Sequence, residues 1–241
     1  MNNEIKIFNN TDELSEYLGN FWKQKIDELE SNKFYSIALS GGNTPIKIFN
    51  YLSENFRDKI DWNRIKFFWG DERCVPPSDN DSNYKLANDY LLRNVNLDES
   101  NIFRIKGERE PIEEAKAYSK IIEANLPIAN GSPKFDFILL GLGEDGHTAS
   151  IFPHEIELFS SQNYCEVAVH PVSGQKRITI TGNIINNAET VTFVAIGKSK
   201  AERVFEIINK TKVAKNYPAS LVNPINGIVN WFLDVESSSR L

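Results

Sequence analysis

Apolar positions recur along the chain with two different spacings, and segments of the two kinds alternate. From Thr11, the expected N-cap, to Leu29, apolar residues recur every three or four positions, which predicts an amphipathic helix. Further helices are expected from Pro45, which suits a first helical turn, and over residues 82–92, 111–126 and 199–209. Short apolar runs bounded by turn residues predict strands over residues 35–39, 65–69, 135–140, 177–180, 191–196 and 228–233.

Strands that alternate with helices predict an α/β fold, a parallel sheet with helices on both faces. The 241 residues contain no repeat, no low-complexity tract and no segment typical of a linker. We therefore expect a single domain over residues 1–241. In such sheets ligands bind beyond the carboxyl ends of the strands, so the loops that follow the strands are the first place to look for a site.

Composition narrows the class of protein. Hydrophobic residues make up 41% and charged residues 25% of the chain, which is typical of a globular protein. The net charge of −6 argues against nucleic acid and anionic membranes as partners, and no apolar stretch approaches the roughly 20 residues of a membrane helix. Cys74 and Cys165 are too few for a disulfide scaffold. We expect a cytoplasmic protein whose polar tail, residues 237–239, frays.

The first loop after a strand leads directly into a helix. Its sequence is Ser40-Gly41-Gly42-Asn43-Thr44-Pro45. Glycines let backbone N–H groups converge, a helix N-terminus adds the positive end of its dipole, and Ser40 and Thr44 add hydroxyl donors, which together suit a phosphate. An ordinary tight turn with Thr44 as the helix N-cap explains the same residues. The segment is not a Walker loop, because the Gly-Lys-Ser/Thr ending is absent.

The second loop begins with three consecutive charges, Asp71, Glu72 and Arg73. They directly follow a buried-looking strand, where Asp71 and Arg73 would point into a cleft and Arg73 would stabilise an anion. The alternative is a solvated turn with Cys74 as a small, partly buried filler. The sequence leaves both interpretations open.

The third loop contains His147, one of three histidines. The loop is rich in glycine, and Asp145 stands two residues before the histidine, where it can fix the imidazole tautomer; His147 is therefore a candidate general base. Residues 141–146 spell Gly-x-Gly-x-x-Gly, but two acidic residues and the following Pro153 do not fit a dinucleotide site. The histidines also lack the spacing of metal ligands.

Two further cations follow in the chain. Lys200 lies near a helix N-terminus, where a positive charge is unfavourable unless an anion is shared. Arg177 stands at the start of a strand. Each alone is most simply an exposed cation, but together with the glycine turn they indicate a phosphate pocket.

A resemblance to a known family is carried by residues 40–45, 71–73, 81–84, 135–136, 141–153, 177–179, 197–201 and 218–220. The most specific part is the run Gly143-Glu144-Asp145-Gly146-His147 with its continuation Ala149-Ser150-Ile151-Phe152-Pro153. In this order, and over nearly the whole chain, the segments resemble the glucosamine-6-phosphate isomerase/6-phosphogluconolactonase family, and within it the lactonases. Asn43 departs from the serine that is usual in the family, and Cys74 is also a less usual residue beside the arginine.

The resemblance implies a doubly wound, three-layer α/β sandwich with a mostly parallel central sheet. It implies hydrolysis of 6-phospho-D-glucono-1,5-lactone, the second step of the oxidative pentose phosphate pathway, without a metal or other cofactor. His147 would be the general base, and Asp71 and Arg73 would face the sugar ring. The substrate's phosphate end would be lined by Gly41, Gly42, Thr44, Arg177 and Lys200, and Ser40 and Asn43 would also bind the substrate. Asp145 would orient the imidazole or cap the loop backbone. We expect the lactone as partner and a monomer or weak dimer.

Two alternatives compete with the lactonase. The deaminases of the family carry a glutamate five residues after the histidine, where this chain has Phe152, and a phenyl ring cannot polarise an imidazole. A non-catalytic sugar-phosphate-binding module, as found in transcription regulators, needs a helix-turn-helix segment. No basic DNA-reading helix is apparent in this chain.

Overall fold

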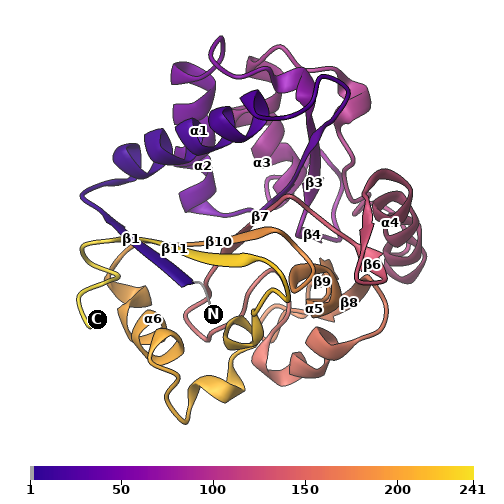
Figure 1. Ribbon diagram of the computed structural model, residues 1–241. Coiled ribbons are helices and arrows are strands. Elements are labelled where there is room, and N and C mark those ends of the chain that lie inside the picture. The colour runs from indigo at the N-terminus through magenta and orange to yellow at the C-terminus, as the bar shows by residue number, and fades with distance from the viewer. Residues whose placement is uncertain (1–2) are drawn as a thin grey trace.

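The computed structural model describes residues 3–241, and a parallel sheet of six strands lies at its centre (Figure 1). The strands are β1 (Asn3–Phe8), β2 (Tyr35–Leu39), β3 (Ile65–Trp69), β7 (Phe137–Gly141), β10 (Thr190–Ala195) and β11 (Ile228–Asp234). Their order is β1-β11-β10-β7-β2-β3, with parallel pairing throughout. The chain runs outward from β2 to β3 and then returns to β7 on the other side of β2. The direction of winding therefore reverses between β2 and β7.

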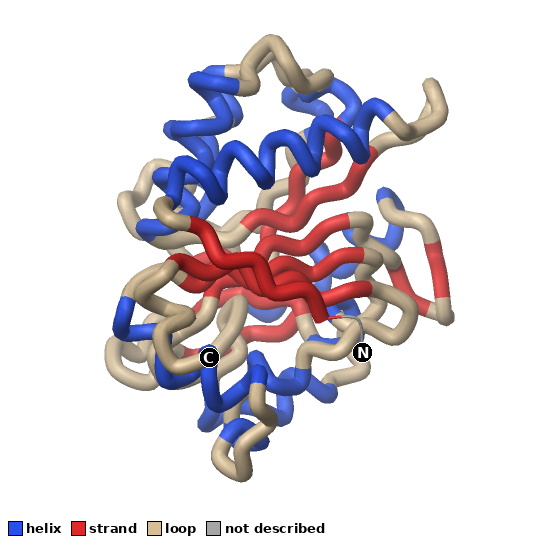
Figure 2. Tube along the Cα trace, turned by 60° about the vertical axis from the view of Figure 1, so that its left-hand side comes forward, coloured by secondary structure: helices blue, strands red, loops and turns tan. Residues whose placement is uncertain are grey.

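Helices cover both faces of this sheet, which makes three layers (Figures 1 and 2). On one face lie α1 (Thr11–Asp27), α2 (Asn43–Asn55) and α3 (Asn83–Tyr90). On the other lie α5 (Gly182–Ile185) and α6 (Ala201–Ile208), while α4 (Pro111–Asn125) packs on a smaller sheet. The 3-10 helices are η1 (Trp62–Arg64), η2 (Leu92–Asn94), η3 (Glu99–Asn101), η4 (Pro153–Ser160), η5 (Lys198–Lys200), η6 (Ala214–Asn216) and η7 (Pro218–Leu221). The predicted three-layer, doubly wound α/β fold with a mostly parallel central sheet is confirmed.

The first helix shows how the apolar spacing becomes a packed face. Its buried apolar residues are Leu14, Leu18, Trp22 and Ile26. The N-cap is Asn10, whose backbone is extended and whose side chain accepts a hydrogen bond from the Glu13 N–H at 2.9 Å. The prediction of Thr11 as the cap is wrong by one position, because Thr11 is already the first residue of the helix.

A second, antiparallel sheet stands beside the central one, in the order β4 (Asp71–Arg73), β9 (Lys176–Ile180) and β8 (Cys165–Val169). The strand predicted at 177–180 exists, but it belongs to this sheet and not to the parallel one. Gly70 joins the two sheets: its N–H donates to the Leu39 carbonyl, and its own carbonyl accepts from the Ile180 N–H, both at 2.8 Å. A short hairpin, β5 (Ile128–Ala129) and β6 (Ser132–Pro133), completes the strands.

Both ends of the described chain depart from expectation. Strand β1 was not predicted, because Ile5 and Ile7 on this edge strand are 43% and 54% exposed and form no continuous apolar run. The tail does not fray at Ser237, which is buried and donates its N–H to Asp234 Oδ1 at 2.8 Å. None of the helices within residues 3–241 combines the length and apolar character needed to cross a membrane. That residues 1–241 form a single domain stays a prediction.

Candidate active site

The predicted site residues gather at the carboxyl edge of the central sheet. Strands β10, β7, β2 and β3 are neighbours there, and each of the four loops chosen from the sequence follows one of them. Two adjoining cavities, of about 230 and 160 Å³, share Ser40, Gly41, Gly42 and Lys200 in their lining. Asp71, Arg73, His147 and Arg177 also line the first, and Asn43 and Thr44 the second. Asp145 lines neither cavity. Both cavities lie at the point where the winding reverses, which is where ligands bind in open α/β sheets.

The glycine turn at the start of α2 presents backbone donors. Gly42 is the N-cap, with φ at +105°, a left-handed conformation that favours glycine. Within residues 3–241 no side chain caps this helix, and its first turn carries no acidic residue, so the first N–H groups and the positive end of the dipole can serve an anion. Thr44 lies within the first turn, so the alternative that it is only the N-cap is wrong. Pro45 is the third residue of α2, which begins earlier than expected.

Two arginines stand side by side on the small sheet. Arg73 of β4 and Arg177 of β9 are directly paired in the antiparallel register, where like charges repel unless an anion neutralises them. The Nε atom of each is buried and has no hydrogen-bond partner among the described residues. Burial lowers the pKa of Arg177, and the nearby carboxylate of Asp71 opposes that shift. The pair thus offers unused donors and positive charge to a ligand oxyanion.

Asp71 is a buried carboxylate at the edge of the larger site cavity, with 5% of its surface exposed. It accepts a hydrogen bond from Ser150 Oγ at 2.6 Å, and Arg177 Nη1 donates to the same Oγ at 3.5 Å. Ser150 therefore links the acidic residue to the cation, and it follows Ala149, which adopts a left-handed φ of 48°. The hydrogen bond from Ser150 fixes the position of the Asp71 carboxylate, which remains a polar part of the cavity wall.

His147 is fixed by its own loop. Its Nδ1 lies 2.6 Å from Asp145 Oδ1, and the same carboxylate oxygen accepts the His147 backbone N–H at 3.1 Å. Burial raises the pKa of Asp145, but the hydrogen bond and attraction to His147 outweigh burial and lower the pKa to about 2. A Cβ at Gly143 would lie 2.1 Å from His147 Nδ1, so only glycine leaves room for this pair. On its other side the imidazole contacts the buried ring of Phe152, 4.8 Å away between centroids.

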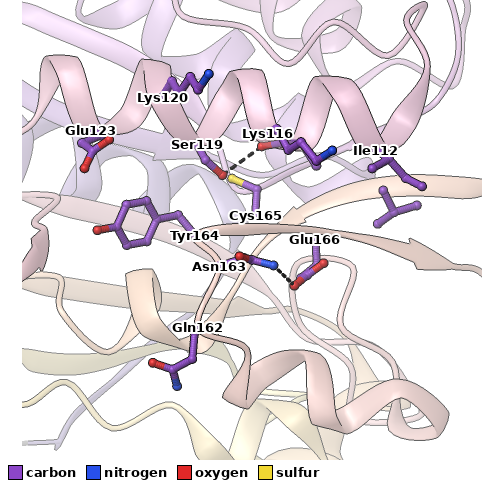
Figure 3. A pocket seen from close by; sticks show the side chains of 12 residues that line it. Ile112, Lys116, Ser119, Lys120, Glu123, Gln162, Asn163, Tyr164, Cys165 and Glu166 are labelled. Carbon is purple, nitrogen blue, oxygen red and sulfur yellow. Dashed lines mark hydrogen bonds between the residues drawn. The ribbon is translucent and has the colours of Figure 1, made fainter.

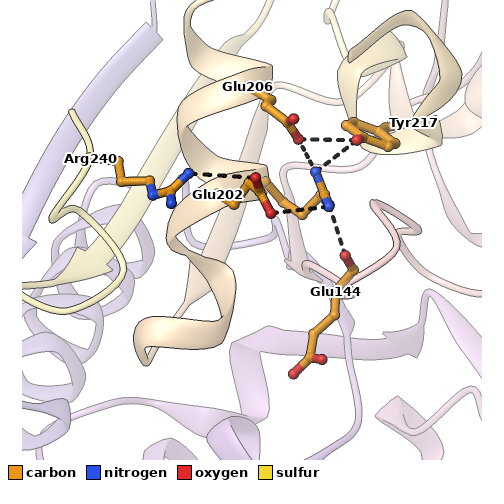
Figure 4. A network of polar contacts seen from close by, with 6 residues as sticks. Glu144, Glu202, Glu206, Tyr217 and Arg240 are labelled. Carbon is orange, nitrogen blue, oxygen red and sulfur yellow. Dashed lines mark hydrogen bonds and ion pairs between the residues drawn. The ribbon is translucent and has the colours of Figure 1, made fainter. Parts of the chain in front are cut away.

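The histidine loop is braced by a side chain of α6 and by Tyr217, the residue before η7 (Figure 4). Arg203 Nε donates to the Glu144 carbonyl at 2.9 Å, and its Nη1 donates to Tyr217 Oη at 2.7 Å and pairs with Glu206. The ring of Tyr217 packs against Gly146, where a Cβ would lie 2.4 Å from the ring. Because Lys200 immediately precedes α6, the brace ties the histidine loop to the lysine that lines both cavities.

Sequence reasoning assigned no role to Asn83 or Ser150, although both fall within the segments that carry the family resemblance. Asn83 lines the larger site cavity, and Ser150 bonds to Asp71 behind it. Asn83 opens α3 after the N-cap Ser82, so its sequence context is that of an ordinary helix start. No local signal distinguishes such a residue from a capping residue.

A cavity larger than the two site cavities lies elsewhere in the molecule. A cavity of about 630 Å³ lies between α4 and β8, lined among others by Ser119 and Cys165 (Figure 3). None of the predicted site residues lines it, and burial raises the pKa of the Cys165 thiol to about 12, which disfavours the reactive thiolate. Within residues 3–241 no group of three or more His, Cys, Asp or Glu side chains is arranged to hold a metal ion.

Comparison with known proteins agrees with the resemblance. The family model described as glucosamine-6-phosphate isomerases/6-phosphogluconolactonase matches residues 9–231. The chain is 47% identical over 179 residues to the 6-phosphogluconolactonase of Treponema pallidum, covering 74% of each protein. It is 42% identical over 201 residues to that of Haemophilus influenzae, covering 82% of this chain and 84% of the relative. The solved 6-phosphogluconolactonase of Trypanosoma brucei matches with a TM-score of 0.87 and 29% identity, over 99% of this chain and 98% of that one. The chain belongs to the family of glucosamine-6-phosphate isomerases and 6-phosphogluconolactonases.

Proposed function

We propose that this chain hydrolyses 6-phospho-D-glucono-1,5-lactone to 6-phospho-D-gluconate, the second step of the oxidative pentose phosphate pathway. The proposal is carried by one observation: an imidazole fixed by a carboxylate and a glycine turn backed by cations line the same cavity. Relatives 47% and 42% identical carry the name of this activity, which supports the same assignment here.

His147 acts as the general base in this proposal. Because Nδ1 is bonded to Asp145, Nε2 is the atom that accepts a proton from water. The water oxygen bonds to the lactone carbonyl carbon and the carbonyl oxygen becomes an oxyanion. The ring C–O bond then breaks, and the leaving ring oxygen takes the proton back from the imidazole. Such a base contributes about 10²–10⁴-fold to the rate.

In this proposal the remaining site residues bind the substrate and stabilise the oxyanion. Arg73 stabilises the oxyanion, Asp71 faces the ring, and Asp145 orients the imidazole. The phosphate is bound by Gly41, Gly42, Thr44, Arg177 and Lys200, and Ser40 and Asn43 also contact the substrate. Holding the phosphate fixes the carbonyl relative to the base, which lowers the entropic part of the barrier.

Deamination of glucosamine 6-phosphate is the competing function, since the family name covers both activities. Phe152 argues against it: this position, five residues after the histidine, would need a carboxylate to assist ring opening. The phenyl ring is fully buried and packs against both His147 and Arg177, whose Cζ lies 5.6 Å from its centroid. A binding module without turnover is disfavoured by the His147–Asp145 pair, which has the geometry of a supported base.

Two assays on the purified protein test the proposal. Freshly prepared lactone is followed by coupled formation and oxidation of 6-phosphogluconate, with spontaneous hydrolysis subtracted, and glucosamine 6-phosphate is followed by ammonia release. We expect acceleration of the first reaction and none of the second. Ammonia release without lactone hydrolysis would overturn the assignment.

We also propose a cellular location, an oligomeric state and a partner for the enzyme. We place it in the cytoplasm, as a monomer or weak dimer whose partner is the sugar-phosphate lactone and not nucleic acid or membrane. Analytical ultracentrifugation at micromolar concentration tests the oligomeric state, and a stable higher oligomer would contradict it.

A further inference from the structure

Asn83 is a buried polar residue of the site that the proposed function leaves without a role. It is the first residue of α3, it is 1% exposed, and it lines the larger site cavity together with His147. Its Nδ2 donates to the backbone carbonyl of Asp71 at 2.9 Å. Its Oδ1 is buried and has no hydrogen-bond partner among residues 3–241. A buried carbonyl of this kind is uncommon in folded proteins and calls for an explanation.

The orientation of this amide is set by its surroundings. The Asn83 backbone N–H donates to Glu72 Oε1 at 2.7 Å, which anchors the start of α3 on β4. Turning the amide over would bring Oδ1 against the carbonyl oxygen of Asp71, where two acceptors repel each other. Nδ2 therefore stays on Asp71, and Oδ1 stays on the side away from it.

Oδ1 lies against the glycine turn. A Cβ built on Gly41 would stand 1.7 Å from Oδ1, so the amide oxygen fills the space that any side chain at residue 41 would need. Gly41 lines both site cavities. A hydrogen-bond acceptor thus stands beside a turn whose backbone donors suit an anion.

The chemistry of this acceptor limits what can lie next to it. A phosphate dianion carries only acceptor oxygens and would be repelled, whereas a hydroxyl can donate. We propose that Asn83 Oδ1 accepts a hydrogen bond from one ring hydroxyl of the sugar-phosphate lactone and determines specificity for that hydroxyl. The inference rests on the proposed function and adds an orientation: one ring hydroxyl of the substrate lies on the side of Gly41 that faces Asn83, and the phosphate lies on the other side of the turn, toward Thr44 and Lys200.

Lactones that lack one hydroxyl test this pairing. The substrates are 6-phospho-D-glucono-1,5-lactone and its 2-deoxy, 3-deoxy and 4-deoxy derivatives, each rate being divided by that lactone's spontaneous hydrolysis. For wild type we expect one derivative to lose about tenfold or more in kcat/KM, because it leaves Oδ1 unpaired. For Asn83→Ala we expect kcat/KM for the parent lactone to fall by a similar factor relative to wild type. For the affected derivative, kcat/KM should be the same in Asn83→Ala as in wild type.

Asn101→Ala is the matched control. Asn101 is also a buried asparagine whose Nδ2 donates to a backbone carbonyl, that of Asn63 at 3.1 Å, but it does not line the site. We expect both Asn101→Ala and Asn83→Ala to have a lower melting temperature than wild type. Asn101→Ala should nevertheless discriminate among the lactones as wild type does.

The inference would be overturned if, for every deoxy lactone, the ratio of its kcat/KM to that of the parent lactone were the same in wild type and in Asn83→Ala. If Asn83→Ala does not fold, wild type alone decides: undiminished kcat/KM for all three derivatives contradicts the pairing. Absence of parent-lactone hydrolysis would instead contradict the proposed function. In that case, dissociation constants of 6-phosphogluconate and its three deoxy derivatives, compared between wild type and Asn83→Ala, test the pairing without turnover.

Discussion

Asp71 and Glu72 are neighbouring acidic residues of β4, and both are buried, with 5% and 2% exposure. Because side chains alternate along a strand, they point to opposite faces of it. Glu72 accepts hydrogen bonds from the N–H groups of Arg73, Asn83 and Tyr84. Asp71, on the other face, takes one hydrogen bond from a serine and borders the cavity.

The hydrogen-bond partners of a buried charged group distinguish a structural role from a role in ligand binding. The donors around Glu72 are all supplied by the chain, and together they fasten α3 to β4, although burial still raises the pKa of Glu72. Around the cavity, Nε of Arg73, Nε of Arg177 and Oδ1 of Asn83 have no hydrogen-bond partner within residues 3–241. A complete set of partners indicates a structural role, and an incomplete set at a cavity indicates a ligand.

The largest effect is expected on the cavity face. His147→Ala removes the proposed base, so kcat should fall by about 10²–10⁴-fold while the melting temperature changes little. His154→Ala is the control, because His154 stacks on the same Phe152, at 5.9 Å between centroids, but does not line the cavity. The coupled lactone assay measures both, and near-normal kcat in His147→Ala would rule out its role as base.

A smaller effect is expected for Lys200, whose substitution should change KM and not kcat. Lys200→Ala removes a charge from the proposed phosphate end, and a charge-assisted hydrogen bond is worth roughly 1.5–3 kcal/mol, so KM should rise about 10- to 100-fold at nearly constant kcat. Lys198→Ala, in the same η5 turn but outside both cavities, should leave KM unchanged. A fall in kcat at constant KM in Lys200→Ala would contradict a phosphate contact.

A matched pair of amide variants tests whether the two faces of β4 have different roles. Glu72→Gln turns an amide toward backbone donors, so the free energy of unfolding should drop by roughly 1–3 kcal/mol. Asp71→Asn should cost less stability and should lower kcat/KM. Urea unfolding and the lactone assay give both quantities. If the two variants lose stability and activity to the same degree, the two faces of β4 do not differ in the way described here.

The smallest expected effect concerns pH. The pKa of Asp145, about 2, lies below the ordinary value of about 3.9, so its contribution to stability is complete above the ordinary value and is lost as pH falls toward the lower one. Wild type should therefore lose more unfolding free energy than His147→Ala as pH falls from about 5 to about 3. The difference should be small, because the pair is partly exposed to solvent. Equal acid sensitivity of the two proteins would show that the pair does not stabilise the fold.

Much of the fold follows from the sequence, because apolar spacing directly reports buried faces. The failures have local causes. The edge strand β1 has solvent-facing isoleucines, and β4 consists of the three charged residues 71–73, so neither shows an apolar run. Without β4 and β8, neither of which is among the predicted strands, the strand at 177–180 had no visible partner outside the parallel sheet.

The candidate site could be predicted where it depends on strand ends, because parallel strands bring their following loops to one edge. What the sequence did not reveal depends on contacts between distant residues. Asn83 faces the cavity because its amide bonds to the carbonyl of Asp71, and Ser150 matters because it joins Asp71 to Arg177. Such roles leave no periodic or local pattern.

We propose that His147 and the glycine turn bind the two ends of one substrate molecule. A crystal structure of the protein with 6-phospho-D-gluconate would show both ends at once. We expect the phosphate on the N–H groups at Gly42–Thr44 and on Lys200, with the carboxylate beside His147 and Arg73. A phosphate beside His147, or a ligand outside both cavities, would show that this assignment is wrong.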